Sequence, residues 1–169
     1  MKSKSIIDEL IGLVKDFQND QKVEYFSGQK KGNLVFLGKD SNSGPNFEFG
    51  DLRVEFENAR VIVEVDTAGG ITNLAKYFFM LNKPDDFNFE EIEPKNQRKK
   101  YTYLLHIFVC LDDTDYRAHR ELWCYINESL KANNFNPKIK VWYTKQTEIK
   151  KNEQVKTKFE KLLNEASKK

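Results

Sequence analysis

Apolar residues recur along the chain at two different spacings, and each spacing predicts a different kind of element. From Ser5 to Phe17 the apolar side chains fall at every third or fourth position, which is typical of an amphipathic helix. The same spacing predicts a helix from Ile71 to about Lys83, which ends before Pro84. Two more helical stripes are predicted later in the chain: Leu122, Trp123, Ile126 and Leu130 in one, and Val155, Phe159, Leu162, Leu163 and Ala166 in the other.

Shorter apolar runs, rich in β-branched and aromatic residues, predict the strands. Residues 101–111 are almost all apolar, which is typical of a central strand that is covered on both faces. In residues 139–143 apolar and polar positions alternate, which predicts a half-exposed or edge strand. Further strands are predicted at residues 33–38, 52–56 and 61–66, of which the last two flank a short hairpin loop.

The order of these elements predicts the fold class. Helices and strands alternate along residues 1–169, with a strongly charged, loop-like stretch from Pro84 to Lys100. Such an order calls for an α/β fold with one central mixed sheet that is flanked by helices. We therefore expect a single domain that ends in a basic C-terminal helix.

The composition is that of a folded protein. Hydrophobic residues make up 39% of the 169 residues, which argues against disorder. No apolar run approaches the roughly 20 residues of a membrane span, and the first helix lacks the pattern of a signal peptide, so we expect a cytoplasmic protein. The two cysteines, Cys110 and Cys124, form neither a disulfide framework nor a zinc pattern.

Charge is distributed unevenly, although the net charge is only +2. From Lys138 to the C-terminus there are ten lysines and four acidic residues, so the rest of the chain is acidic overall. This basic part could contact nucleic-acid phosphates, with Lys138, Lys140 and Lys145 as candidates, or it could be a solvated terminal helix.

A cluster of acidic residues is predicted on the hairpin. Side chains alternate along a strand, so Glu64 and Asp66 point to one face while the valines between and before them point to the core. A loop centred between residues 58 and 59 places Asp51 opposite Asp66, and Arg53 opposite Glu64. Three carboxylates would then share one patch and could hold Mg²⁺, which prefers oxygen ligands. In the alternative interpretation Arg53 pairs with Glu64, the two aspartates lie in water, and nothing binds.

A short motif runs through the hairpin and beyond it. It consists of Gly50-Asp51, residues 61–66 (VIVEVD), Gly69-Gly70, and a predicted helix that contains Asn73 and Lys76. Together with the order of elements, this motif resembles the core of the restriction-endonuclease-like superfamily, the PD-(D/E)XK nucleases. By that resemblance Asp51 matches the first acid of the family motif and Glu64 the second. Gly50 stands where the family typically has proline, and Asp66 stands where it has lysine, so Lys76 is the candidate replacement for that lysine.

The resemblance implies a Mg²⁺-dependent endonuclease that hydrolyses phosphodiester bonds in DNA, with Mn²⁺ as a substitute metal. Asp51 and Glu64 would bind the metal together with the backbone carbonyl of Val65. Asp66 and Lys76 would complete the catalytic set. Cutting both strands of a duplex would favour a two-fold homodimer.

Two other functions stay open at this point. The chain could be a non-catalytic nucleic-acid-binding or assembly module on the same fold, since the motif lysine is absent. A metal-dependent phosphotransferase could instead use Asp112, Asp113 and Asp115, although these residues also suit helix capping. His106 belongs to none of these sets, and its place within an apolar strand predicts a hydrogen-bonded core histidine.

Overall fold

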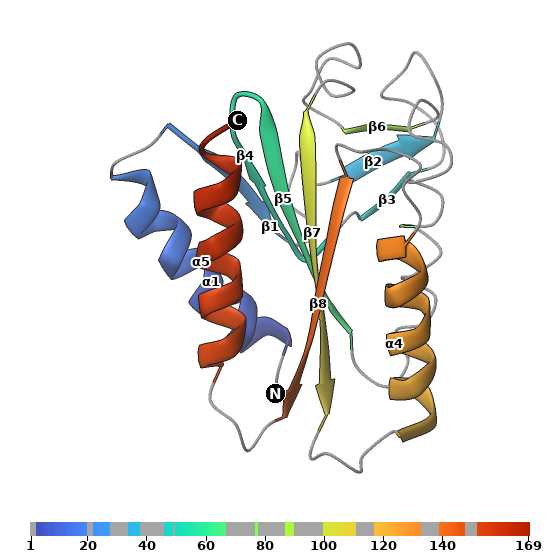
Figure 1. Cartoon of the computed structure of the whole chain (residues 1–169). Helices are drawn as coiled ribbons and strands as arrows, with labels where there is room; N and C mark the ends of the chain where they lie inside the picture. The colour runs from blue at the N-terminus through green and yellow to red at the C-terminus, as the bar shows by residue number, and fades with distance from the viewer. Residues whose placement is uncertain are drawn as a thin grey trace.

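A five-stranded mixed sheet forms the centre of the computed structural model (Figure 1). Its strands lie in the order β1-β4-β5-β7-β8. The pairs β1–β4 and β4–β5 are antiparallel, whereas β5–β7 and β7–β8 are parallel. The strands span Glu24–Ser27 (β1), Leu52–Glu55 (β4), Ala59–Asp66 (β5), Tyr101–Cys110 (β7) and Ile139–Thr147 (β8).

The structure describes most of the chain. The described residues are 3–19, 22–27, 34–37, 46–48, 50–66, 77, 87–89, 100–110, 117–132, 139–147 and 152–169. Several residues named from the sequence lie outside these ranges: Lys76, Lys138, Asp112, Asp113 and Asp115.

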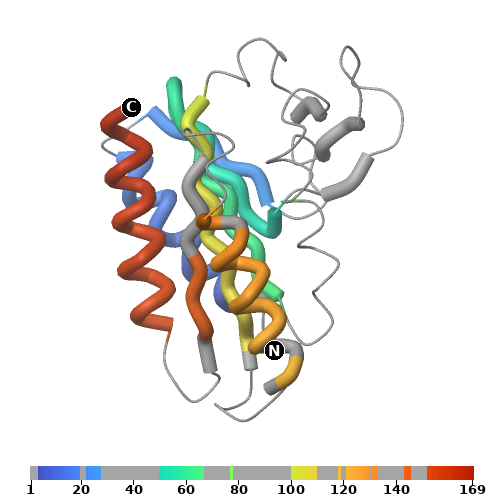
Figure 2. The backbone as a smooth tube through the Cα atoms, turned by 45° about the vertical axis from the view of Figure 1, so that its right-hand side comes forward, coloured from blue at the N-terminus to red at the C-terminus, as the bar shows by residue number. Residues whose placement is uncertain are grey.

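Helices cover both faces of the central sheet. α1 (Ser3–Gln18) and α5 (Glu153–Ala166) lie together on one face, and α4 (Arg117–Ala132) lies on the other (Figures 1 and 2). In the described part of the chain, no helix is long and apolar enough to cross a membrane.

A smaller, three-stranded sheet accompanies the central one, with the strand order β3-β2-β6. Its strands are Leu34–Leu37 (β2), Asn46–Glu48 (β3) and Phe87–Phe89 (β6). The predicted α/β class and mixed sheet are therefore confirmed. The prediction of one sheet is wrong, because β2, predicted from residues 33–38, pairs with β3 and β6 and belongs to this second sheet.

The face of the central sheet toward α1 and α5 is apolar. Val61, Val63 and Val65 of β5 all belong to this core, as the alternation in the sequence predicted. Burying one large apolar side chain contributes about 1.5–3 kcal/mol, so this layer supplies much of the folding free energy. The two helices contribute residues at helical spacing, which confirms both predicted helices: Ile6, Leu10, Val14, Val155, Phe159 and Leu162.

α4 turns a different side toward the sheet from the one predicted. Trp123 and Asn127 are buried, whereas Leu122 is 44% exposed and Ile126 is only partly buried. The predicted stripe is therefore confirmed at Trp123, wrong at Leu122 and only partly buried at Ile126, while the side chain of Leu130 lies outside the described part of the structure. The reason lies on β7, where the polar side chain of His106 faces this helix and binds Asn127.

The hairpin between β4 and β5 turns one residue earlier than predicted. Phe56 N–H donates to the Ala59 carbonyl at 2.9 Å, so these two residues close the turn. Arg53 consequently pairs with Ile62, and its predicted pairing with Glu64 is wrong. The two registers differ by two residues, which leaves every side chain on the same face, so the apolar pattern could not distinguish them.

Candidate acidic site

Ionisable side chains are buried on the face of the sheet that is opposite α1 and α5. They include both acidic and basic side chains, and each is at most 7% exposed. Burying a charge costs several kcal/mol unless a partner compensates it, so each of them needs a partner. The buried set comprises Arg53, Glu55, Arg60, Glu64, Asp66 and His106.

Three carboxylates gather at one end of this face. Glu64 and Asp66 lie two residues apart on β5, so they point to the same side. Asp51 directly precedes β4, its N–H donates to the Val63 carbonyl at 2.8 Å, and its charge acts on Tyr77 together with those of Glu64 and Asp66. Val65 N–H donates to Asp51 Oδ2 at 2.7 Å, so the main chain of β5 fixes the Asp51 carboxylate.

Tyr77 lies where the three carboxylates meet. It is fully buried, and its hydroxyl donates a hydrogen bond to Glu64 Oε2. Burial raises the pKa of Tyr77 well above its ordinary value, and the charges of Glu64, Asp66 and Asp51 raise it further. The hydroxyl therefore stays protonated and remains a donor to Glu64.

Sequence reasoning did not single out Tyr77. It falls in the predicted helix over residues 71–83, and it is the one residue of that range that the structure describes, in a helical conformation. Nothing in its spacing separates it from the aromatic residues around it. Its role becomes visible only when its hydroxyl is seen to reach Glu64 on β5.

His106 lies next to the same acids on the neighbouring strand. The parallel register pairs it with Glu64, and its Nε2 forms a hydrogen bond with Asp66 Oδ2. Its Nδ1 lies 3.0 Å from Asn127 Oδ1, and the indole Nε1 of Trp123 lies 3.2 Å from its Nε2. The prediction of a hydrogen-bonded core histidine is confirmed, but its link to the acidic cluster depends on the pairing of β5 with β7 and could not be predicted.

The main-chain polar groups of Val65 face the Asp51 side of β5. In an antiparallel pair, the N–H and C=O of one residue point to the same neighbouring strand. The Val63 carbonyl accepts the Asp51 N–H at 2.8 Å, and Val65 is two residues further along the same strand. The Val65 carbonyl therefore points to the side of the strand on which Asp51 lies.

Gly50 fixes the backbone just before Asp51. Its φ of +82° is a conformation that glycine adopts readily and proline cannot, because the proline ring holds φ near −65°. A Cβ at this position would lie 2.7 Å from Ile62 Cγ2 and 3.0 Å from the Val63 carbonyl oxygen. The backbone before Asp51 therefore requires glycine at the position where the resembled family typically has proline.

A second charged centre lies at the other end of the same face. Glu55 Oε2 is 2.9 Å from Lys100 Nζ, and Glu55 Oε1 is 3.5 Å from Arg53 and 3.7 Å from Arg60. Burial lowers the pKa of Arg60, while the charge of Glu55 acts in the opposite direction. One buried carboxylate thus lies within ion-pair distance of three cations, which is an arrangement that holds strands together.

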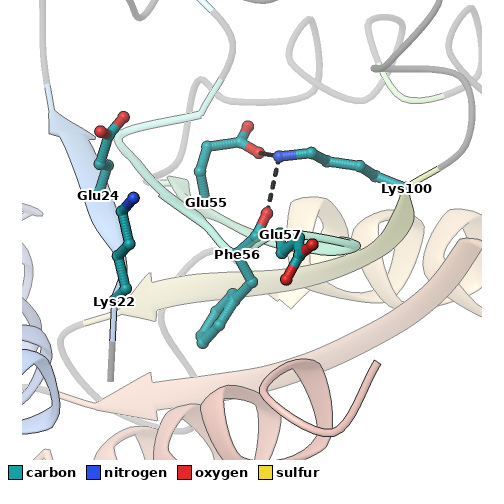
Figure 3. A pocket seen from close by; sticks show the side chains of 6 residues that line it. All are labelled: Lys22, Glu24, Glu55, Phe56, Glu57 and Lys100. Atoms are coloured by element: carbon teal, nitrogen blue, oxygen red, sulfur yellow. Dashed lines mark hydrogen bonds and ion pairs between the residues drawn. The ribbon is translucent and has the colours of Figure 1, made fainter. Parts of the chain in front are cut away.

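A pocket of about 480 Å³ opens beside this second centre (Figure 3). Lys100 Nζ is already bound there to the Glu55 carboxylate and, at 2.7 Å, to the Phe56 carbonyl. We place the candidate functional site at the acidic cluster and not here, because the cluster contains the acids that the sequence motif singled out, Asp51, Glu64 and Asp66. The pocket is lined by Lys22, Glu24, Glu55, Phe56, Glu57 and Lys100.

The candidate basic residues lie at or near the edge strand β8. Lys145 is exposed on this strand. Lys140 belongs to the same strand, but its side chain lies outside the described part of the structure, as do Lys138 and Lys76 as a whole. The terminal position of β8 in the sheet confirms the predicted edge strand.

The donors of the acidic cluster suit a hard divalent cation. Carboxylate oxygens and main-chain carbonyls are the protein ligands that Mg²⁺ and Mn²⁺ prefer. Asp51 and Glu64 provide carboxylate oxygens near Tyr77, and the Val65 carbonyl points toward the side of β5 on which Asp51 lies. Among the described residues, no group of three or more His, Cys, Asp or Glu side chains is arranged to hold a metal ion. A metal here would therefore use two carboxylates, one main-chain carbonyl and water.

Comparison with known proteins assigns no family to this arrangement. No protein-family model, no curated protein and no solved structure matches the chain. The function has to be argued from the residues of the acidic cluster.

Proposed function

We propose that this protein is a metal-dependent nuclease that hydrolyses phosphodiester bonds in DNA. The observation that carries the proposal is the closeness of Asp51 to Glu64: both charges act on the buried Tyr77, and Val65, the neighbour of Glu64, donates its N–H to Asp51 Oδ2 at 2.7 Å. Asp51 is partly exposed, whereas Glu64 is only 4% exposed, so a substrate would approach from the Asp51 side.

We also assign the α/β fold to the restriction-endonuclease-like type. The support is the order of elements: a helix, a strand-rich core that includes the β4–β5 hairpin, and then strands that alternate with helices. This is the order that the resemblance implies. The same resemblance relates Asp51 and Glu64 to the two acids of the family motif.

The residues of the site have separate roles in this proposal. Asp51, Glu64 and the Val65 carbonyl would hold Mg²⁺, which when bound polarises the scissile phosphate and lowers the pKa of a bound water. The Val65 N–H holds the Asp51 carboxylate in place, and the Tyr77 hydroxyl holds that of Glu64. Lys76 would position the attacking water or offset the charge that develops on the phosphate.

The test is Mn²⁺ binding and DNA cleavage by the variants Asp51→Asn and Glu64→Gln. Both variants are expected to lose metal binding and at least about 10²-fold in cleavage rate, because each removes a charged ligand. Glu57→Gln is the matched control, since Glu57 is exposed in the hairpin turn, and it should change neither property. Cleavage that persists in both site variants would contradict the proposal.

DNA binding through the basic strand is a separate part of the proposal. Lys145, and with it Lys138 and Lys140, would neutralise phosphates on the substrate. The logarithm of the binding constant should then fall with the logarithm of salt concentration, with a slope of about −0.9 per phosphate contacted on duplex DNA. Binding that does not change with salt would contradict this part.

A second candidate function is a non-catalytic nucleic-acid-binding or assembly module. The observation that favours it is that all three acids of the cluster already form hydrogen bonds within the protein: Asp51 with the Val65 N–H, Glu64 with Tyr77 and Asp66 with His106. This candidate predicts no cleavage with Mg²⁺ or Mn²⁺ of single-stranded DNA, duplex DNA or RNA. Salt-dependent binding without cleavage would favour it over the nuclease.

A further inference from the structure

Lysines from three elements gather around Tyr143 on the edge strand β8. This strand contacts α5 on one face of the sheet and α4 on the other (Figure 1). Lys158 of α5 donates a hydrogen bond to the Tyr143 carbonyl at 3.0 Å. Lys131 of α4 lies over the Tyr143 ring, with its Nζ 5.2 Å from the ring centroid. Lys145 follows Tyr143 by two residues, so its exposed side chain lies on the face of the sheet that the Tyr143 ring occupies.

This group of side chains holds more positive than negative charge. Glu128 brings one negative charge: it accepts a hydrogen bond from the Tyr143 hydroxyl, and its Oε1 lies 3.5 Å from Lys131 Nζ. The side chains of this ion pair are 57% and 45% exposed, so water weakens their attraction. Burial lowers the pKa of Lys158, and the charge of Lys131 lowers it further. Two ammonium groups that repel each other in this way are both stabilised by a nearby anion.

The strand register aligns this group with the acidic cluster. Asp66 pairs with Phe108, and Phe108 pairs with Lys145, so the three residues form one row across β5, β7 and β8. Glu64 and Tyr143 lie in a second row, on either side of the β7 residue that pairs with both. Because neighbouring strands lie about 4.8 Å apart, the backbone of Lys145 is about 10 Å from that of Asp66. This separation corresponds to roughly three phosphates along one strand of a duplex, so a strand that reaches the acidic cluster also reaches β8.

We propose that Lys131, Lys145 and Lys158 form one phosphate-binding surface, which holds the nucleic-acid backbone roughly three phosphates from the acidic cluster. This inference rests on the proposed function, and it adds residues of α4 and α5 to the lysines of β8. The partner is a nucleic acid, because a chain of regularly spaced phosphates meets the three lysines and the acidic cluster at the same time. Such contacts position the substrate and read no base sequence.

The experiment measures the binding of a short duplex DNA by fluorescence anisotropy at several salt concentrations, without divalent metal. Each lysine that neutralises a phosphate contributes about 0.9 to the steepness of log K against log salt. Lys131→Ala, Lys145→Ala and Lys158→Ala should each make the slope shallower by about that amount, and the triple variant by about 2.7. Glu128→Gln should bind the same duplex about two- to threefold more tightly, because it removes the negative charge beside Lys131.

Lys156→Ala is the matched control. Lys156 also lies on α5, but its Nζ is 3.0 Å from the carboxylate of Glu9 on α1. This variant loses the same charge as Lys158→Ala, yet its salt slope should stay that of the wild type. An equal change of slope in both variants would mean that DNA responds to net charge alone, and it would overturn the inference.

A cleaved duplex tests where the surface holds the strand. On a duplex whose cut position has been mapped, one phosphate at a time is replaced by an uncharged methylphosphonate. Lys145→Ala should weaken binding of the unmodified duplex, and this loss should disappear when the replaced phosphate lies roughly three positions from the cut. A loss that persists wherever a phosphate near the cut is replaced would overturn the placement.

The outcomes separate this inference from the proposed function. If the three lysine variants keep the wild-type slope while the wild type cuts DNA, the inference is overturned and the nuclease proposal stands. If the slopes become shallower but the wild type cuts nothing with Mg²⁺ or Mn²⁺, the surface is supported and the nuclease proposal fails. Lysines on an edge strand also prevent pairing with other chains. That role alone predicts variants that associate in light scattering and bind DNA with an unchanged slope, which again overturns the inference.

Discussion

The two faces of strand β5 are built from alternate residues of one eight-residue segment, yet they are chemically opposite. On one face Val61, Val63 and Val65 pack against α1 and α5 in an apolar layer. On the other face Glu64 and Asp66 are equally buried, but their neighbours are polar side chains that bind them. Replacing buried ion pairs by apolar residues is often neutral or stabilising, so stability alone does not account for the polar face. The apolar face thus stabilises the fold, whereas the polar face carries the acids to which we assign the proposed function.

Removing a large side chain from the apolar face is the strongest test of this division. Phe159 of α5 is fully buried, and Phe159→Ala should lower the free energy of unfolding by about 3–5 kcal/mol, because it removes apolar contacts and leaves a cavity. Urea denaturation measures this loss. Glu160→Ala, at an exposed position of the same helix, should change it by less than about 0.5 kcal/mol.

The same variant also tests whether the two faces of the sheet are independent of each other. Where Phe159→Ala still folds, Mn²⁺ should bind as in the wild type, because the side chain belongs to the opposite layer from the acidic cluster. A Phe159→Ala protein that is fully folded but has lost Mn²⁺ binding would show that the two faces are not independent.

Lys76 offers the next largest effect, on catalysis and not on stability. Lys76→Ala is expected to reduce DNA cleavage by about 10²-fold, because it removes a positive charge near the developing charge of the phosphate. Metal affinity and the urea midpoint should change little, since the ammonium group is not a metal ligand. Single-turnover cleavage and Mn²⁺ titration measure the two properties separately.

Lys83→Ala is the matched control for Lys76→Ala, because both lysines belong to the predicted helix over residues 71–83. It should leave cleavage unchanged within about twofold. Equal and small effects of the two changes, in an enzyme that cuts DNA, would exclude Lys76 as the replacement for the family's lysine.

The smallest expected effect concerns Tyr143, where β8 meets α4. Its hydroxyl donates to Glu128, and this bond together with partial burial raises the pKa of Tyr143 from 10.0 to about 12. Because the pKa is raised in the folded state, the stabilisation of the fold by this hydrogen bond is fully present below pH 10 and is lost as the pH rises toward 12. The urea midpoint should therefore fall over this range in the wild type and fall less in Tyr143→Phe. Identical pH dependence of the two proteins would show that the bond contributes nothing.

Much of the fold could be predicted because its signals are local. The period of an amphipathic helix located α1 and α5, and the two-residue alternation assigned the valines of β5 to the core. The alternation in residues 139–143 likewise indicated the edge strand β8. Each of these signals depends on a few neighbouring residues, whose side chains have fixed directions once the backbone is helical or extended.

The site could be predicted only in part, because these local signals do not report contacts between distant segments. Local alternation indicated that Glu64 and Asp66 share a face, and the nearby hairpin brought Asp51 into the same region. It could not choose between two hairpin registers that expose the same faces, so the predicted partner of Arg53 was Glu64, whereas the structure pairs Arg53 with Ile62.

The sequence by itself therefore determined α1 and α5, the core face of β5 and the acids of the hairpin. Only the tertiary structure decided which side chains hold those acids. Tyr77 and His106 reach Glu64 and Asp66 from segments 13 and 40 residues away in the chain, and no periodicity links them. The parallel pairing of β5 with β7 and the packing of α4 create the contacts of His106. A buried carboxylate is stable only beside a hydrogen-bond partner, and here the tertiary structure supplies that partner from a distant segment.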